Sequence, residues 1–324
     1  MSLNIAIQMD PIESIDIYAD SSFILAVEAQ SRRHKLLYFT PNQLSFYNGE
    51  VFARARSMEV RFIKNDHFLL GEEKKINLAD LDVILMRQDP PFDMAYITAT
   101  HILEKIQPET LVINDPVHVR NSPEKILVTQ FEEFIPPTLI SSDMKSIREF
   151  YAKYQDIIIK PLYGNGGKEI FHIKPRDENL TALLEMFADK YREPIITQMY
   201  IPDVHKGDKR IILIDGKPIG AVLRVPLKGE IRANFHAGGG AQKTSLTQRE
   251  RKICEAIGPY LSEHGLFFVG IDVIGDYMTE INVTSPTGIH EINRLNGIKI
   301  EKIFWDCVEK KLMQLRKKSG NRNS

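Results

Sequence analysis

Apolar runs of strand length alternate with segments of helical spacing along the first part of this 324-residue chain. The expected strands lie at 3–7, 35–40, 83–86 and 111–113, the expected helices at 21–33 and 96–106, and extended hairpin segments at 51–63 and 66–70. Strands that alternate with helices form a largely parallel sheet, and such sheets place ligand crevices beyond their strand ends. We therefore expect an N-terminal α/β unit whose loops at 89–91 and 114–116 face a ligand.

A capped helix start at 121–125 marks the expected domain boundary, because Pro123 and Glu124 suit the first turn of a helix. Strands are then expected at 157–160, 169–173, 195–198, 209–214, 218–225, 269–274 and 277–283, and helices at 179–190, 247–264 and 299–315. We expect an N-terminal domain at 1–122, and a second domain at 123–316 with a lid-like subdomain at about 137–200 and a C-terminal subdomain at about 201–316. Residues 317–324 are expected to form a disordered polar tail.

The composition is that of an ordinary globular protein, with 43% apolar and 26% charged residues. A formal net charge of −1 gives the chain no general attraction to nucleic acid or to an anionic membrane. The first residues do not show a basic start followed by an apolar run and a small-residue cleavage site, and no apolar segment is long enough to span a bilayer. We therefore expect a cytoplasmic protein with neither nucleic acid nor a membrane as its partner.

Several kinds of catalytic or metal site are not indicated by the sequence. Cys254 and Cys307 lack the spacing of a zinc site or a redox pair, which favours small buried apolar residues. The histidines share no ligand spacing, and neither a Gly-x-Ser-x-Gly elbow nor a nucleophilic Cys–His pair is indicated. Covalent hydrolase chemistry and a transition-metal cluster are therefore not expected.

Three oxygen-bearing side chains interrupt the two apolar strands on either side of the Gly275–Asp276 turn. Glu280 and Asn282 fall on one face of the second strand, and Asp272 lies on the neighbouring strand within their reach. Mg²⁺ prefers one or two carboxylates completed by phosphate and water. Solvated edge charges are the simpler alternative for Asp272 or Glu280 alone, but the three residues together predict a magnesium-phosphate site.

A lysine at the end of a strand, Lys160, precedes a glycine-rich loop at 161–168. Glycines allow backbone N–H groups to enclose phosphate oxygens, and Lys160 can add a positive charge to the same group. No helix that starts with Gly-Lys-Ser/Thr follows, so the loop is not a Walker motif. A plain hairpin with turn glycines is the alternative for this loop taken alone.

Arg210 and Arg224 lie within apolar strands, where a guanidinium needs a carboxylate or phosphate partner. A surface ion pair is the alternative for each arginine taken singly. The stretch at 232–240 is a polar loop that ends in glycines and that can act as a lid. With Lys125 and Lys160 on its phosphates, a nucleoside triphosphate can pass its terminal phosphate to a carboxylate, which gives an acyl phosphate open to attack by an amine.

In order and spacing, several stretches resemble those of the bacterial glutathione synthetases of the ATP-grasp superfamily, over essentially the whole chain. The stretches are Met86–Asp93, Asn114–Pro116, Pro123–Lys125, Ile159–Gly167, Gly207–Arg210, Asp272–Asp276 and Glu280–Gly288. The resemblance implies an α/β protein in which a Rossmann-like pre-ATP-grasp domain precedes a two-subdomain α+β ATP-grasp fold. It also implies an ATP-dependent ligase that joins γ-glutamylcysteine to glycine through an acyl phosphate, releases ADP and phosphate, and forms a homotetramer or homodimer.

The resemblance and the motifs together assign roles to residues at matching positions. ATP contacts are expected from Lys125, Lys160, Gly164, Gly166, Gly167 and Asp208, and from an adenine-binding strand of Gln198, Met199, Tyr200 and Ile201. The implied metal ligands are Asp272, Glu280 and Asn282, which would hold Mg²⁺, with Mn²⁺ as the alternative. Arg210 and Arg224 resemble the catalytic residues that stabilise the transferring phosphate and the substrate carboxylate, and the expected substrate contacts are Asn234, Ser285, Thr287 and His290.

Three positions depart from the family pattern, since Gln88 stands where lysine is expected, Gly240 where arginine is common, and His290 where another arginine is expected. The changes at Gly240 and His290 remove fixed positive charge near the expected peptide substrate or the expected lid loop at 232–240. A histidine at position 290 carries a positive charge only in part near neutral pH. Two alternatives remain open. One is another ATP-grasp carboxylate–amine ligase that forms a dipeptide or adds glutamate, and the other is a non-catalytic ATP-binding module similar to synapsin. The intact metal ligands and Arg210 argue against the module.

Overall fold

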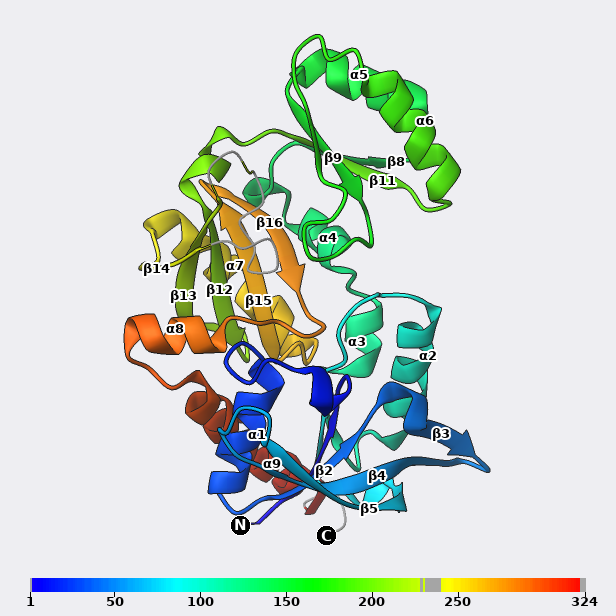
Figure 1. Cartoon of the computed structure of the whole chain (residues 1–324), viewed down its shortest axis with the longest axis vertical. Coiled ribbons are helices and arrows are strands. Elements are labelled where there is room, and N and C mark those ends of the chain that lie inside the picture. Colours follow the sequence, from blue (N-terminus) through cyan, green and yellow to red (C-terminus); the bar gives the residue numbers. More distant parts are fainter. Residues whose placement is uncertain (1, 228–229, 231–239, 321–324) are drawn as a thin grey trace.

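The computed structural model describes residues 2–227, 230 and 240–320. Three sheets follow one another along the long axis of the molecule (Figure 1). A seven-stranded sheet forms one end, a five-stranded sheet the middle, and a four-stranded sheet the other end. The site described below lies where these three sheets meet.

The seven-stranded sheet contains the parallel strands expected at the N-terminal end. Its order is β3-β4-β2-β1-β6-β7, with β5 paired to β4. The strands are β1 (Asn4–Gln8), β2 (Lys35–Phe39), β3 (Leu44–Tyr47), β4 (Glu50–Val60), β5 (Phe68–Asn77), β6 (Val83–Met86) and β7 (Leu111–Ile113). β1 pairs in parallel with β2 and β6, and β6 with β7. The helices α1 (Ser21–Ser31) and α2 (Met94–Leu103) make the crossovers that parallel pairs require.

The four-stranded sheet is antiparallel throughout and has the order β10-β9-β11-β8. Its strands are β8 (Thr138–Ser141), β9 (Ile157–Pro161), β10 (Phe171–Ile173) and β11 (Ile195–Met199). The helices α5 (Met144–Tyr154) and α6 (Leu180–Lys190) lie together against this sheet (Figure 1). They enclose an apolar core of their own, which includes Ile157, Leu184 and Phe187.

The five-stranded sheet carries the hairpin that was singled out from the sequence. It is antiparallel, with the order β14-β13-β12-β15-β16. Its strands are β12 (Asp208–Ile214), β13 (Lys217–Val225), β14 (Gly240–Lys243), β15 (Phe268–Ile274) and β16 (Tyr277–Asn282). The remaining α-helices are α3 (Pro116–Arg120), α4 (Glu124–Leu127), α7 (Gln248–Glu263), α8 (Ile289–Asn296) and α9 (Ile300–Gly320). Short 3-10 helices lie at Ile12–Ser14, Pro41–Gln43, Leu78–Asp80, Glu104–Ile106, Val128–Phe134 and Pro202–Lys206.

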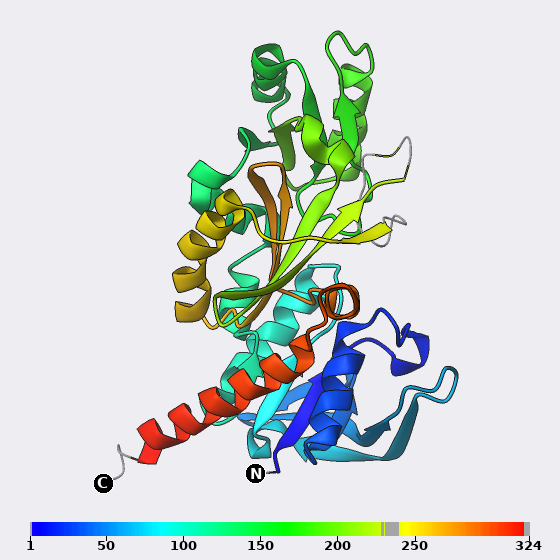
Figure 2. The same ribbon diagram turned by 90° about the vertical axis from the view of Figure 1, so that its left-hand side faces the viewer.

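The C-terminal helix α9 returns the chain to the N-terminal unit and is longer than expected. It runs to Gly320, whereas the sequence pattern predicted an end at Leu315. Trp305 Nε1 donates to the carbonyl oxygen of Leu25 in α1 at 2.8 Å, and Arg32 forms an ion pair with Asp306 at 2.7 Å. Figure 2 shows α9 alongside the N-terminal unit. The C-terminal helix therefore packs against α1 of the N-terminal unit.

None of the helices in the part of the chain that the structure describes is long and apolar enough to cross a membrane.

The apolar core is continuous between the seven-stranded and five-stranded sheets. Ile7 of β1 shares one cluster with Ile212 of β12, and Ile84 of β6 shares another with Val269 of β15. The four-stranded sheet has a separate cluster. The expected domain boundary at residue 122 therefore stays a proposal about chain organisation, because the core itself does not divide there.

The buried side chain of Asn114 joins the end of β7 to the five-stranded sheet. Its Nδ2 donates to the carbonyl oxygens of Phe268 (2.8 Å) and Val283 (2.7 Å), and its Oδ1 accepts from Phe268 N (2.7 Å). Buried backbone groups need such partners. The loop at 114–116 is not part of the cavity wall, so Asn114 has a structural role here in place of the ligand-facing role expected for its loop.

Replacing Asn114 with alanine should lower the free energy of unfolding by about 2 to 5 kcal/mol, because three buried backbone groups lose their partner. Chemical denaturation monitored by circular dichroism would measure the change. Asn4→Ala is the matched control, since the Asn4 side chain is exposed, and it should stay within about 0.5 kcal/mol of wild type. Equal stability of the Asn114 and Asn4 variants would contradict the structural role of the Asn114 side chain.

Candidate functional site

A cavity of about 1030 Å³ lies where the three sheets meet. Its wall includes Asp10 and Asp89 next to the seven-stranded sheet, Lys160 and Gln198 from the four-stranded sheet, and Asp272 from the five-stranded sheet. The loop at 89–91 therefore contributes to the cavity as expected. A cavity of this size can hold a ligand as large as a nucleotide.

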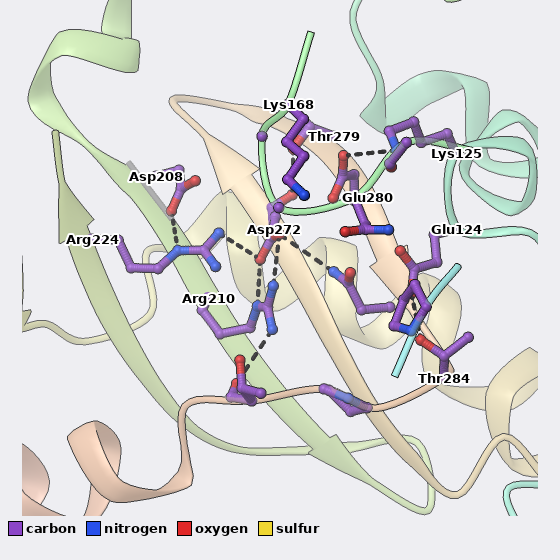
Figure 3. Close-up of a pocket in the computed structure, with 18 of the residues that line it drawn as sticks. Glu124, Lys125, Lys168, Asp208, Arg210, Arg224, Asp272, Thr279, Glu280 and Thr284 are labelled. Atoms are coloured by element: carbon purple, nitrogen blue, oxygen red, sulfur yellow. Dashed lines mark hydrogen bonds and ion pairs between the residues drawn. The ribbon is translucent and has the colours of Figure 1, made fainter. Parts of the chain in front are cut away.

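The three predicted metal ligands lie on the β15–β16 hairpin and line the cavity. Figure 3 shows Asp272 and Glu280 on these two strands. Asp272 pairs with Glu280 across the two strands, and Asn282 pairs with Gly270. Two carboxylates and an amide oxygen on adjacent strands fit a hard cation such as Mg²⁺. Within residues 2–227, 230 and 240–320, no group of three or more His, Cys, Asp or Glu side chains is arranged to hold a metal ion. Phosphate and water would therefore have to complete the coordination of a cation at these residues.

Two buried arginines hold Asp272 from the neighbouring strands (Figure 3). Arg210 of β12 donates through Nε to Asp272 Oδ1 at 2.5 Å and through Nη2 to Oδ2 at 2.9 Å. Arg224 of β13 contacts the same Oδ1 through Nη2 at 2.9 Å, and its Nε donates to Asp208 Oδ1 at 2.5 Å. A Cβ atom at Gly270 would lie 3.1 Å from Arg210 Cδ, so glycine leaves room for this arginine. The arginines form a buried network, and the alternative of surface ion pairs does not hold for them.

The charges of this network set the protonation of its two carboxyl groups. Burial by itself raises the pKa of Asp272, but the attraction and hydrogen bonds of Arg210 and Arg224 outweigh burial and hold this pKa below its ordinary value. Burial, aided by the negative charge of Asp272, raises the pKa of Asp208 to about 6 despite the Arg224 partner. Asp272 is therefore the more acidic of the two carboxyl groups and stays ionised throughout the neutral pH range.

Two buried lysines face Glu280 from the opposite side of the cavity. Lys125 Nζ lies 3.7 Å and Lys160 Nζ lies 3.9 Å from Glu280 Oε1. Burial lowers the pKa of Lys160 to about 8, with the charge of Glu280 opposing the shift and that of Lys125 adding to it. Two ammonium groups beside one carboxylate leave an excess of positive charge, which favours an anion such as phosphate at this point.

The glycine loop is at once a hairpin connection between β9 and β10 and a part of the cavity wall. Gly164, Gly166, Gly167 and Lys168 line the cavity. The φ angles of Gly166 (+64°) and Gly167 (+73°) lie in the left-handed region that favours glycine. Lys125 Nζ donates to the carbonyl oxygen of Gly164 and so connects the loop to α4.

The predicted adenine-binding strip at 198–201 forms another edge of the cavity at the end of β11. Tyr200 stacks on His172 with 3.9 Å between the ring centroids, and its hydroxyl forms a hydrogen bond with His205 Nε2 at 2.8 Å. His172 Nε2 in turn donates to Asp156 Oδ1 at 2.6 Å. These contacts fix the Tyr200 ring, so the strip presents a defined wall to a base.

Ser285 and Thr287 line the cavity on the turn that follows β16. Ser285 Oγ donates to Asp89 Oδ1 at 2.6 Å, which joins the turn to the seven-stranded sheet. The carbonyl oxygen of Thr287 accepts from Arg210 Nη1 at 3.3 Å. The turn is therefore held between a loop of the N-terminal unit and the arginine network.

Some predicted positions are not brought to the cavity. His290 is absent from the cavity wall and donates through Nε2 to the carbonyl oxygen of Asp20 at 3.0 Å, because α8 directs this residue toward α1. Asn234 lies outside the described residues. Gly240, which begins β14, and the buried Gln88 do not line the cavity either.

Several charged wall residues were not assigned to the site from the sequence, among them Arg87, Glu124, Lys168 and Glu291. Burial and then the negative charge of Glu280 raise the pKa of Glu124 to about 7. Thr284 Oγ1 donates to Glu124 Oε1 at 2.9 Å. The sequence contained a signal for two of these residues. Arg87 is a charged residue directly after a buried strand, and Glu291 is an acid in the first turn of a helix.

Replacing Arg224 with methionine should lower the free energy of unfolding by about 3 to 5 kcal/mol, because its removal leaves the buried Asp208 carboxylate unpaired and leaves Asp272 with Arg210 alone. Urea denaturation would measure the loss, and adding Asp208→Asn should restore part of it. Arg54→Met is the matched control, since Arg54 is 71% exposed, and should change stability by less than about 1 kcal/mol. If the changes in unfolding free energy of the Arg224 and Asp208 variants simply add in the double variant, the two residues do not interact and the proposed ion-pair network is contradicted.

Two family models cover nearly the whole chain. Residues 3–120 match the prokaryotic glutathione synthetase N-terminal domain, and residues 124–297 match the prokaryotic glutathione synthetase ATP-grasp domain. The chain is 58% identical to a glutathione synthetase of Mesorhizobium japonicum over 96% of this chain and 99% of that protein. A glutathione synthetase of Pseudomonas putida is 45% identical over 96% and 99% of the two chains.

Solved structures share the fold at low sequence identity. D-cycloserine synthetase DcsG has a TM-score of 0.67 and 12% identity, over 95% of this chain and 100% of that chain. The ATP-grasp ligase PsnB, in a complex with a precursor variant, Mg and ADP, has a TM-score of 0.60 and 15% identity, over 96% and 98%. These structures support the ATP-grasp architecture expected from the sequence. The chain therefore belongs to the prokaryotic glutathione synthetase family.

Proposed function

We propose that this chain joins γ-glutamylcysteine to glycine in an ATP-dependent reaction that releases ADP and phosphate. The observation that carries the proposal is the placement of three oxygen ligands opposite Lys125 and Lys160 in one cavity. Such an arrangement suits a nucleoside triphosphate with its metal. Relatives named glutathione synthetase, such as the one at 58% identity, support this choice of substrates.

In this proposal the base of ATP lies against the strip at 198–201, and its phosphates lie between Lys125, Lys160 and the glycine loop. Asp208 borders the same cavity. The positive charge around Glu280 favours the phosphates, and backbone N–H groups of the glycines can donate to their oxygens. The terminal phosphate then points toward Arg210.

Asp272, Glu280 and Asn282 would hold the Mg²⁺ that accompanies ATP, with Mn²⁺ as the alternative. When bound, Mg²⁺ offsets negative charge on the phosphates. Asp272 can accept a cation without first losing a proton, because Arg210 and Arg224 hold its pKa down.

The first step forms the acyl phosphate. A carboxylate oxygen of the cysteine residue attacks the terminal phosphorus of ATP, and the bond to the bridging oxygen breaks as ADP leaves. Such a transfer depends mainly on positioning and charge stabilisation. Lys160 and Arg210 supply the positive charge, while Arg224 keeps Asp272 and Asp208 in place.

The second step forms the amide bond. The glycine amine, after loss of a proton, attacks the carbonyl carbon of the acyl phosphate, and phosphate leaves with the bonding electrons. Ser285 and Thr287 border the part of the cavity next to Arg210, where this acceptor would lie. A preorganised wall at this point limits the motion of both reactants.

We further propose a cytoplasmic homotetramer or homodimer. The family resemblance supports assembly from copies of one chain. Both cysteines, Cys254 and Cys307, are free thiols, which accords with a reducing compartment. Light scattering on a size-exclusion column would measure the mass of the assembly, and a monomer at micromolar concentration would refute the oligomer.

Incubation of the protein with Mg-ATP, γ-glutamylcysteine and glycine tests the proposed reaction. Phosphate release and tripeptide formation should be equal in amount and should depend on all three substrates. Mass spectrometry identifies the product, and a reaction without protein is the control. Absence of tripeptide, combined with product from another acid and amine, would reject these substrates while keeping ATP-dependent ligation.

Replacing Glu280 with glutamine should lower turnover about 100-fold and raise the Mg²⁺ concentration required for half-maximal rate, because one anionic oxygen ligand is lost. Magnesium titrations of the rate, together with Mn²⁺ binding followed by electron paramagnetic resonance in the presence of ADP, would measure both effects. Glu109→Gln at an exposed position is the control. Wild-type Mn²⁺ binding by the Glu280 variant would refute its role as a ligand.

A further inference from the structure

The guanidinium of Arg87 has a donor without a partner. Arg87 follows β6, is 6% exposed and forms part of the cavity wall. Its Nε donates to Ser22 Oγ at 3.0 Å, its Nη2 donates to the carbonyl oxygen of Pro286 at 3.1 Å, and its Cζ lies 5.3 Å from the centroid of the Phe268 ring. No described residue accepts a hydrogen bond from Nη1. A buried cationic donor is costly unless a bound anion completes it.

A second wall residue, Glu291, has a carboxylate oxygen without a partner among the described residues. Glu291 is in the first turn of α8 and forms part of the wall. Its Oε2 is buried and accepts from no described residue. The helix α8 follows Pro286, which accepts from Arg87, and contacts α1, whose Ser22 also accepts from Arg87. Arg87 and Glu291 therefore belong to one corner of the cavity.

The other carboxyl groups of this corner already accept hydrogen bonds. Asp10 Oδ2 accepts from Asp89 N at 2.8 Å, and Asp89 Oδ1 accepts from Ser285 Oγ at 2.6 Å. Asp20 caps the first turn of α1 through its Oδ1. Burial raises the pKa of both Asp10 and Asp20, which disfavours their charged forms. Glu291 is therefore the acceptor best suited to an incoming cation.

We propose that Arg87 binds the α-carboxylate and Glu291 the α-ammonium of the γ-glutamyl residue, so that this corner selects substrates with a free amino-acid head group. The inference rests on the proposed function and names the specificity-determining residues of that site. A guanidinium forms charge-assisted hydrogen bonds with a carboxylate, as a carboxylate does with an ammonium. One zwitterionic group can thus pair with both side chains, which line the same cavity.

Glycine, the other zwitterionic substrate, does not suit this corner. Its amine is the nucleophile and must be neutral when it attacks the acyl phosphate. An ion pair with Glu291 would favour the protonated amine and so oppose the reaction. The α-ammonium of the γ-glutamyl residue takes no part in the chemistry, so it can stay paired throughout.

The turn at 285–288 links this corner to the reacting groups. The carbonyl oxygen of Pro286 accepts from Arg87, and that of Thr287 accepts from Arg210. A substrate whose head group is held at Arg87 can therefore extend along the turn toward Arg210. Its cysteine carboxylate then lies on the side of the cavity where the terminal phosphate of ATP is proposed.

Steady-state kinetics with three substrates test the proposal. These are γ-glutamylcysteine, glutarylcysteine, which lacks the α-ammonium, and 4-aminobutyrylcysteine, which lacks the α-carboxylate. The wild-type protein should prefer γ-glutamylcysteine over either analogue by about 10- to 100-fold in kcat/KM, the range of one charge-assisted hydrogen bond. The Glu291→Gln variant should lose only its preference for γ-glutamylcysteine over glutarylcysteine. The Arg87→Met variant should lose only its preference for γ-glutamylcysteine over 4-aminobutyrylcysteine. The KM values for ATP and glycine should not change.

Controls separate recognition from folding. Arg87 also supports Pro286, so Glu291→Gln, which keeps the shape of its side chain, decides the proposal if Arg87→Met does not fold. Glu263→Gln at an exposed position should keep the wild-type preferences. Equal losses on all three substrates in the Glu291 variant, or a change confined to the KM for glycine, would overturn the assignment.

The wild-type protein alone distinguishes two further outcomes. If it forms tripeptide from γ-glutamylcysteine and uses the analogues equally well, the proposed function stands and the head-group site is overturned. If it forms product from none of the three substrates, the proposed function itself is overturned, and the assignment of Arg87 and Glu291 falls with it.

Discussion

The buried ion pairs around Asp272 are the interaction on which the rest of the site depends. They connect three neighbouring strands, because Arg210 lies on β12, Arg224 on β13 and Asp272 on β15. A buried carboxylate between two arginines has a strong attraction to offset the loss of hydration. The same network leaves Arg210 Nη1 in contact with Thr287, so the position of the substrate turn follows from the pairing of these charges.

The cavity has one wall that belongs to the apolar core shared by two sheets and another wall that belongs to the separate core of the four-stranded sheet. The seven-stranded and five-stranded sheets share their clusters, so the residues around Asp272 and Ser285 lie on one packed body. The four-stranded sheet packs around its own cluster, and across the cavity its Lys160 faces Glu280 through charge. Polar contacts of this kind weaken or strengthen with the charge of a ligand far more than apolar packing does. The lysine side of the cavity is therefore the side whose fit depends most on a bound anion.

Much of the fold could be predicted because local patterns agreed with the final packing. The period-two alternation at 269–283 gave both the hairpin and the shared face of Asp272, Glu280 and Asn282. In contrast, β8 was not predicted, since its four residues are only partly buried and carry a weak apolar signal. The helix α5 that follows it was not predicted either. His290 was expected near the substrate on the basis of its motif, but the chain changes from turn to helix at Ile289, which redirects the side chain.

The substrate corner shows why part of the site was beyond the reach of sequence patterns. Arg87 and Pro286 are 199 residues apart, and no local pattern connects them. Their contact helps to fix the turn because the residues on either side of Pro286 are also hydrogen-bonded, Ser285 to Asp89 and Thr287 to Arg210. Three successive residues of one turn are thus held from the two sheets that share a core. Because that turn is fixed from both sides, the spacing between the head-group corner and the phosphate side of the cavity is set by the backbone, and a substrate of the wrong length would have to give up one set of contacts to make the other.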